Sequence, residues 1–297
     1  MLKSRIWTAL CLILFIVLSI VYFPNWAIAI IAGGVFILGL YEWFHLVGYR
    51  RFPPPLVLIT AFIKWLLITF VLIPLLLMIL ISALYYYGLP LFGPLDWSGP
   101  ANLQMPLLIL LTLGIWIVAF LDVLMYPRGI ENYTKGEKGL IVGFYVLIPA
   151  CFSIVYLQGI SPKWALYPLV LVWAADIGAY ILGKWLGRHK CAPKVSPGKT
   201  WEGIIGGFLA GFLVASLGFY YLNIKLPFTF WMGFNAIIIF FSIVGDLFES
   251  LFKRVHQLKD SGRLLPGHGG ILDRIDSLTA ALPIFAVLGR VLEIFYT

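Results

Sequence analysis

The stretch FTFWMGFNAIIIFFSIVGDLFESL, Phe228 to Leu251, decides the fold class of this protein. It is long enough to cross a hydrocarbon layer of ~30 Å, which needs about 20 apolar residues. A helix is the expected form, because an isolated strand leaves its backbone groups without hydrogen-bond partners in lipid. Two carboxylates, Asp246 and Glu249, lie near the end of this stretch. We therefore predict a transmembrane helix that carries acidic groups at one end.

Similar apolar runs occupy most of the chain. The predicted spans are Ile6–Tyr22, Trp26–Leu46, Leu56–Tyr87, Met105–Met125, Gly139–Leu157, Trp164–Trp185, Trp201–Tyr221, Phe228–Leu251 and Ser277–Phe295. The composition is 62% hydrophobic and 11% charged, with a mean hydropathy of +0.99, whereas soluble domains carry ~25% charged residues. We predict an all-α, polytopic membrane protein with about nine transmembrane helices. Pro74 could kink the third run or split it into a span and an interfacial piece.

Charge is distributed unequally over the segments that connect these runs. If the N-terminus is inside, most lysines and arginines fall in inside segments, and the outside loops hold only Lys163 and Lys225. Positive residues mark the cytoplasmic side of a membrane protein. The N-terminus is therefore predicted to be cytoplasmic, in a multi-pass protein of the plasma (inner) membrane. The net charge of +8 is explained by contact with anionic lipid headgroups, so no nucleic acid partner is expected.

Polar residues divide the chain into two regions within one membrane unit. Residues 1–125 have few ionisable side chains inside the predicted spans. Glu42, Lys64 and Asp122 lie near predicted span ends, where side chains can extend to the interface. This region is expected to supply scaffold and lipid contact. Residues 126–297 carry most of the polar groups, and we expect them to form the catalytic region.

Carboxylates lie within or at the predicted ends of three of the last four spans. Asp176 lies inside the sixth span, Asp246 and Glu249 near the end of the eighth, and Asp273 and Asp276 at the start of the ninth. Acidic groups at membrane depth cost ~2.5–3.5 kcal/mol each and usually serve function. The i, i+3 spacing of the last two places them on one helix face, where they could simply complement the helix dipole. Together with Asp246 they also suit Mg²⁺, which prefers oxygen ligands.

Two loops beside these carboxylates could bind phosphate. The run GHGG at 267–270, with His268, Gly269 and Gly270, precedes a helix start. Flexible backbone N–H groups in that position can bind anions, although the run alone is also typical of a turn. We expect His268 to act as a hydrogen-bonding or structural residue of this loop.

The second loop, SPGKT at 196–200, resembles the end of a Walker A motif. The required first glycine is Pro193 here, so we reject a P-loop. Ser196 is instead expected to cap or turn into the seventh span, with Lys199 and Glu202 on its first turns. Lys199 could contact a phosphate, and its position fits a positive membrane anchor equally well.

The stretch from Ser250 to Asp276 resembles the signature of the phosphatidate cytidylyltransferase (CDP-diacylglycerol synthase) family. That signature is S-x-x-K-R-x-x-x-x-K-D-x-[GSA] followed by P-x-H-G-G-x-x-D-R-x-D, and every fixed position is present. SPGKTWEG (196–203), VGDLFES (244–250) and ADIGAYILGKWLGRHK (175–190) also resemble the family. Many members have lysine where this chain has Gly198. The resemblance is strong from about Leu171 onward.

This resemblance implies that CTP and phosphatidate react to give CDP-diacylglycerol and pyrophosphate, with Mg²⁺ as cofactor. It allows a second cation such as K⁺, and it implies a homodimer in membrane lipid with a polar cavity open to the cytoplasm and sideways to the bilayer. The candidate catalytic residues are Asp246, Asp273, Asp276, Lys259 and Asp260, the first three also as metal ligands. The candidate substrate-binding residues are Asp176, Ser196, Lys199, Glu202, His268, Gly269, Gly270 and Arg274.

Three rival functions fit less well. A transporter with acidic carriers in its spans would show internal repeats and broken helices in both halves, whereas polar residues here lie in one half. A CDP-alcohol phosphatidyltransferase would need D-x-x-D-G-x-x-A-R, and no such run is present. A non-catalytic scaffold would have no use for the acidic groups.

Overall fold

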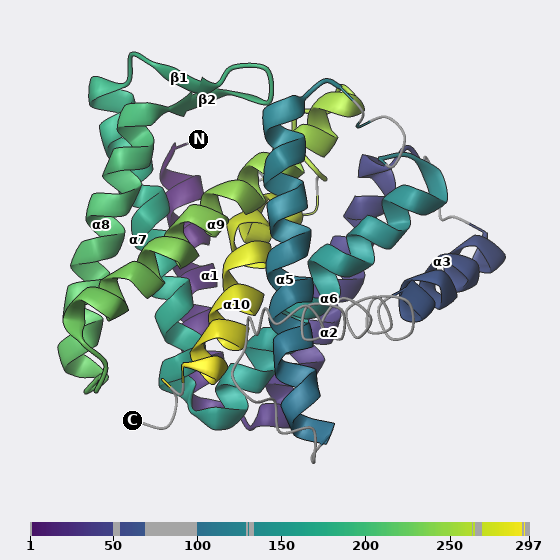
Figure 1. Ribbon diagram of the computed structural model, residues 1–297. Coiled ribbons are helices and arrows are strands. Elements are labelled where there is room, and N and C mark those ends of the chain that lie inside the picture. The colour runs from purple at the N-terminus through teal and green to yellow at the C-terminus, as the bar shows by residue number, and fades with distance from the viewer. Residues whose placement is uncertain are drawn as a thin grey trace, which may run out of the picture.

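The computed structural model describes residues 2–49, 54–68, 100–128, 130, 134–262, 264, 269–292 and 294. Its helices form a membrane bundle with one small hairpin (Figure 1). In chain order the elements are α1 (Leu2–Tyr22), α2 (Asn25–Leu46), α3 (Pro55–Leu67), α5 (Pro100–Met125), α6 (Gly136–Ile160), α7 (Pro162–Leu186), β1 (Lys190–Ala192), β2 (Ser196–Thr200), α8 (Trp201–Tyr221), α9 (Phe228–Val255) and α10 (Leu272–Val291).

The predicted membrane class is confirmed by the lengths and composition of the helices. Among the described residues, five helices are long and apolar enough to cross a membrane: α2, α6, α7, α8 and α9. Shorter apolar helices cover Cys11–Tyr22, Pro55–Leu67 and Thr112–Met125. The total of nine spans stays a prediction, and most of the third predicted span, from residue 69 onward, lies outside the described residues.

One end of the bundle gathers the connections that the sequence predicts to be cytoplasmic. Figure 1 shows the start of α1, the β1–β2 hairpin and the junction of α9 with α10 at the same end, and the C-terminus at the opposite end. The carboxyl end of α7 and the amino end of α8 flank the hairpin. The helix order therefore brings the polar ends of four helices together, while the side of the membrane on which they lie stays a prediction.

Helices α7 and α8 pack closely because small residues line their contact. Gly206 of α8 lies so near Gly178 of α7 that a Cβ on either would collide with the backbone of the other. Small residues continue along the contact at Ala175, Ala179 and Gly183 of α7, at its C-cap Gly187, and at Gly203, Gly207 and Gly211 of α8. Small residues at four-residue spacing let helix backbones approach in membranes. This packing fixes the two helices that form one wall of the site.

The predicted regions 1–125 and 126–297 pack against each other. Helix α2 contacts α6 and α10, and α5 contacts α9 and α10. The indole of Trp43 in α2 is buried and donates a hydrogen bond of 2.9 Å to the Gly139 carbonyl of α6. It also packs against Phe252 of α9, with ring centroids 4.8 Å apart. The N-terminal helices thus hold the polar helices in place.

Candidate active site

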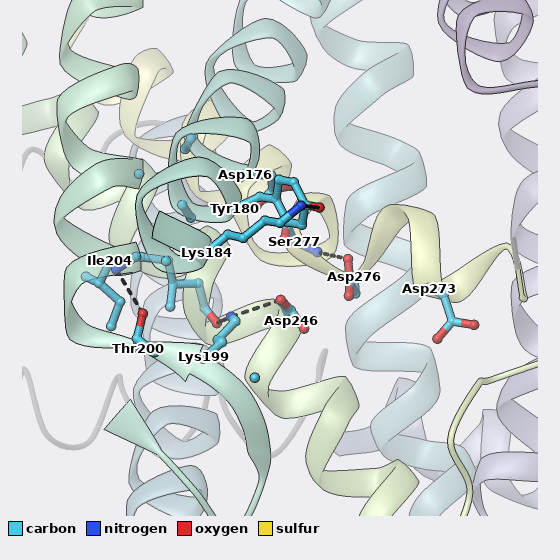
Figure 2. A pocket seen from close by; sticks show the side chains of 17 residues that line it. Asp176, Tyr180, Lys184, Lys199, Thr200, Ile204, Asp246, Asp273, Asp276 and Ser277 are labelled. Carbon is cyan, nitrogen blue, oxygen red and sulfur yellow. Dashed lines mark hydrogen bonds and ion pairs between the residues drawn. The ribbon is translucent and has the colours of Figure 1, made fainter. Parts of the chain in front are cut away.

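A cavity of about 460 Å³ lies between α7, β2, α8, α9 and α10, near the end of the bundle that carries the hairpin. Figure 2 shows its polar side chains arriving from separate elements. The titratable groups that line it are Asp176, Tyr180, Lys184, Lys199, Asp246, Asp273 and Asp276. Three of the last four predicted spans therefore bring carboxylates to one cavity, which the fourth, α8, also lines. The less polar wall of the cavity is formed by the small residues of α7 and α8.

Lys199 and Asp246 form an ion pair inside this cavity. The lysine Nζ lies 2.9 Å from Asp246 Oδ2 and donates a second hydrogen bond of 3.2 Å to the Ile243 carbonyl. The side chains are 21% and 30% exposed, respectively, so the pair remains accessible from the cavity. Strand β2 thus places a cation beside a carboxylate of α9. An incoming phosphate could contact this lysine directly.

Asp276 of α10 brings a second carboxylate to Asp246. Both side chains line the cavity, and Figure 2 shows them facing it from α9 and α10. One Asp276 oxygen also accepts a hydrogen bond of 2.7 Å from the backbone N–H of Ser277. Two carboxylates this close repel each other unless a proton or a cation lies between them. Their arrangement therefore favours cation binding.

Asp273 has a different environment from Asp276, although it also lines the cavity. Its Oδ1 lies 2.8 Å from Lys253 Nζ, and its Oδ2 accepts hydrogen bonds from the backbone N–H groups of Ser261 (3.0 Å) and Gly270 (2.8 Å). Lys253 also binds Glu249 at 3.0 Å. Oδ1 of Asp273 thus binds α9 through Lys253, and Oδ2 holds the loop before α10. Its predicted metal role stays a prediction, and these contacts favour a structural one.

The glycines of the predicted GHGG loop support this arrangement as far as it is described. Gly269 has φ +84°, a backbone conformation that favours glycine, and a Cβ there would collide with Asp273. A Cβ at Gly270 would collide with Ser261 and Glu42. His268 lies outside the described residues. The two described glycines therefore permit close backbone packing around carboxylates.

A magnesium ion fits the pair Asp246 and Asp276 better than the predicted set of three carboxylates. Among the described residues, no three His, Cys, Asp or Glu side chains are grouped so that they could hold a metal ion by themselves. Mg²⁺ usually takes only one or two carboxylates, together with substrate phosphates and water. The side-by-side carboxylates and the open cavity next to them meet that requirement.

The segment before α8 is a hairpin, which corrects the prediction for Ser196. Ser196 begins β2, whose partner β1 runs antiparallel to it, and Lys199 also lies in β2. The cap of α8 is Thr200, whose Oγ1 accepts a hydrogen bond of 3.1 Å from the Gly203 N–H. Ser is the somewhat stronger cap by preference, but the structure uses the threonine next to the predicted start of the span.

Other hairpin contacts are structural. Glu202, a predicted substrate-binding residue, is on the first turn of α8 as expected, but it binds the backbone N–H and the ring Nδ1 of His189, the latter at 2.6 Å. Arg254 at the end of α9 donates a hydrogen bond of 2.9 Å to the Val195 carbonyl. Burial raises the pKa of the Cys191 thiol in β1, so this thiol stays protonated near neutral pH and is a poor nucleophile.

Comparison with known proteins identifies the family of this chain. The model of the cytidylyltransferase family matches residues 3–292. A phosphatidate cytidylyltransferase of Haemophilus influenzae is 36% identical, over 96% of this chain and 98% of its own length. The chain belongs to the cytidylyltransferase family. A phosphatidate cytidylyltransferase of Pseudomonas aeruginosa is 38% identical over 97% of both chains, and one of Staphylococcus aureus is 45% identical over 42% of this chain and 48% of its own.

Some predicted residues of this cytidylyltransferase lie away from the cavity. Lys259 and Asp260 line a separate hollow of about 530 Å³, together with Tyr41 and His45 of α2. Arg274 is exposed on the first turn of α10 and is not part of the cavity lining. The structure therefore brings together the predicted residues Asp176, Lys199, Asp246 and Asp276 in the cavity. The predicted residues Lys259, Asp260 and Arg274 lie outside it.

Glu42 of α2 is the residue that the sequence interpretation misplaced. It was expected to extend to the membrane interface, yet it is 1% exposed. Its carboxylate accepts hydrogen bonds from the backbone N–H groups of Ile271 and Leu272, each of 2.9 Å, and from Ser261 Oγ, of 3.0 Å. Nothing near Glu42 in the sequence indicates these partners, because they follow more than two hundred residues later.

Proposed function

We propose that this protein transfers the cytidylyl group of CTP to phosphatidate, giving CDP-diacylglycerol and pyrophosphate. The observation that carries the proposal is the cavity in which Lys199, Asp246 and Asp276 meet at the ends of membrane helices. A lipid phosphate at the membrane surface and a soluble nucleotide can both reach such a position. Relatives aligned along nearly the whole chain bear the name of this activity.

The chemistry requires little proton transfer. An ionised oxygen of phosphatidate attacks the α-phosphorus of CTP and forms a new P–O bond. The bond between the α-phosphorus and the bridging oxygen breaks, and pyrophosphate leaves with that electron pair. Because the attacking oxygen is already ionised, no general base is needed, and catalysis rests on positioning and on neutralising charge. Lys199 suits this task, because its ammonium acts as a mobile point charge toward phosphate.

Asp246 and Asp276 would hold Mg²⁺ in this proposal. When bound, the metal supplies charge neutralisation for phosphate oxygens and for the leaving pyrophosphate. Asp246 also keeps Lys199 directed into the cavity through their ion pair. A second, monovalent cation such as K⁺ stays part of the proposal, and so does a homodimer.

The proposed active site faces the cytoplasm from the inner membrane. The excess of lysine and arginine in the predicted inside segments supports this orientation, because the hairpin and the junction of α9 and α10 belong to those segments. Soluble CTP would then enter from the cytoplasm, and phosphatidate would enter from the bilayer.

A labelling assay tests the proposal. Purified protein in detergent receives phosphatidate, Mg²⁺ and CTP labelled at either the α- or the γ-phosphate. We expect the α-label to enter the lipid fraction and the γ-label to appear in pyrophosphate, with both products lost when EDTA removes the metal. If neither label leaves CTP, or if the γ-label enters the lipid, the proposed transfer is wrong.

A further inference from the structure

Glu42 is buried in α2, at a contact between the N-terminal and the C-terminal regions. A carboxylate without compensating hydrogen bonds is costly to bury. The three donors that bind Glu42 come from both sides of the loop between α9 and α10: Ser261 before residues 262–270, and Ile271 and Leu272 after them. One side chain of α2 therefore binds the chain on both sides of residues 262–270.

The backbone around Glu42 is shaped to fit it. A Cβ at Gly262 or Gly270 would collide with its carboxylate, so glycine at both positions lets the loop pack directly on the acid. A methyl group of Leu272 also lies 3.3 Å from where a Cβ would stand at Gly39, one turn earlier in α2. The first residue of α10 is thus held by polar and apolar contacts with the same helix.

The contacts of Glu42 also affect the cavity, because they hold the start of α10. Ile271 and Leu272 begin the helix whose next turn carries Asp276, the partner of Asp246. Asp273 binds the same loop from the other side, through Ser261 and Gly270. A shift of the start of α10 would move Asp276 relative to Asp246. Misplacement of a reacting group by about 1 Å can cost 10²-fold in rate.

We propose that Glu42 is a positioning residue for the transfer reaction, which holds the α9–α10 loop so that Asp276 stays beside Asp246. The inference rests on the proposed function for its kinetic part. Glu42 does not line the cavity of Asp246; it borders the separate hollow of Lys259 and Asp260 and binds backbone and hydroxyl groups of the loop.

Two variants test the proposal. Glu42→Gln keeps the length of the side chain and one acceptor oxygen, and Glu42→Ala removes all three hydrogen bonds. The matched control is Glu137→Gln, which changes an acid of α6 that pairs with Lys64 at 2.8 Å. We expect kcat to fall about 10-fold in Glu42→Gln and about 10²-fold in Glu42→Ala. The KM for phosphatidate should stay within about 2-fold, because the cavity walls on α7 and α8 do not touch Glu42.

Hydrogen exchange gives a readout that does not depend on activity. In protein without substrate or metal, the peptide covering residues 261–272 should exchange at least about 10-fold faster in Glu42→Ala, while peptides of α7 and α8 keep native exchange. Glu137→Gln should match the unchanged protein in both measurements. Native kcat in both Glu42 variants, or native exchange of this peptide, would overturn the proposal.

A purely structural role predicts a different result. Less folded protein would be recovered, with kcat per folded molecule unchanged and exchange faster throughout the bundle, and that outcome also overturns the positioning role. If the unchanged protein makes no CDP-diacylglycerol, the proposed function fails and the kinetic role of Glu42 fails with it. Faster exchange confined to residues 261–272 would then still show that Glu42 restrains the loop.

Discussion

The two regions of this protein differ in how they use charge. In the C-terminal region, Asp176, Lys199, Asp246 and Asp276 share one cavity. In the N-terminal region, Lys64 reaches an exposed ion pair with Glu137 of α6, and Glu42 is buried in hydrogen bonds to the α9–α10 loop. The helices of both regions pack into one bundle. The regions therefore differ in where their charged side chains lie, and they do not form separate folding units. In our proposal, the N-terminal helices position the side chains that the C-terminal helices bring to the cavity.

The largest effect expected from the C-terminal region comes from Asp276→Asn. The amide has nearly the same shape as the carboxylate but lacks its charge, so cation binding beside Asp246 is lost. We expect kcat to fall about 10³-fold, as suits the loss of several kcal/mol of charge stabilisation, with an unchanged midpoint of thermal unfolding. Steady-state kinetics and thermal denaturation check this. A rate near native would mean that Asp276 has no part in the site.

Asp273→Asn tests whether Asp273 stabilises the fold or shares the role proposed for Asp246 and Asp276. Both Asp273 and Lys253 are 10% exposed, and breaking a buried ion pair commonly costs about 3–5 kcal/mol. We therefore expect a lower unfolding midpoint together with reduced activity. Native stability combined with a loss of activity as large as that of Asp276→Asn would instead support the predicted metal role of Asp273.

Glycine substitutions compare packing in the two regions. A Cβ at Gly206 would lie 2.5 Å from the Gly178 carbonyl oxygen, whereas a Cβ at Gly33 of α2 would meet no atom within 4 Å. Gly206→Ala should therefore destabilise the protein by about 1–3 kcal/mol through overpacking, and Gly33→Ala should not destabilise it. Thermal unfolding in detergent measures both. Equal effects would show that the α7–α8 contact is not as close as described.

The smallest effect is expected for Lys64→Ala. The Lys64 and Glu137 side chains are 55% and 32% exposed, and exposed ion pairs contribute about 0.2–1 kcal/mol. Activity and stability should both stay near native in the thermal and kinetic assays used above. A loss of activity comparable to that of Asp276→Asn would contradict the division between the two regions.

The parts of the fold that depend on local pattern were predicted from the sequence. Apolar length gave α8 its boundaries, Trp201–Tyr221, and the i, i+3 spacing placed Asp273 and Asp276 together on α10. The acidic ends of separate spans were expected to meet, and they do line one cavity. These features follow from periodicity and from the cost of charge in lipid, which a single sequence displays.

The missed features depend on contacts between distant segments. The ion pair between Asp273 and Lys253 depends on how α9 and α10 pack, and the spacing of residues in the sequence does not indicate it. The buried position of Glu42 depends in the same way on a distant loop. One signal was present but unused: small residues recur at four-residue intervals from Gly203 in α8, as expected for a close helix contact. That pattern could have predicted the α7–α8 wall.

The most direct test of the account is the rate at which purified Asp246→Asn transfers α-labelled cytidylate from CTP to phosphatidate. Asp246 pairs with Lys199 and lines the same cavity as Asp276, so the variant disturbs both the proposed metal site and the lysine proposed to bind phosphate. The account predicts a loss of about 10³-fold relative to the unchanged protein, with the same unfolding midpoint and elution volume. A rate within about 3-fold of native, where an essential charge would cost far more, would contradict a catalytic centre at this cavity.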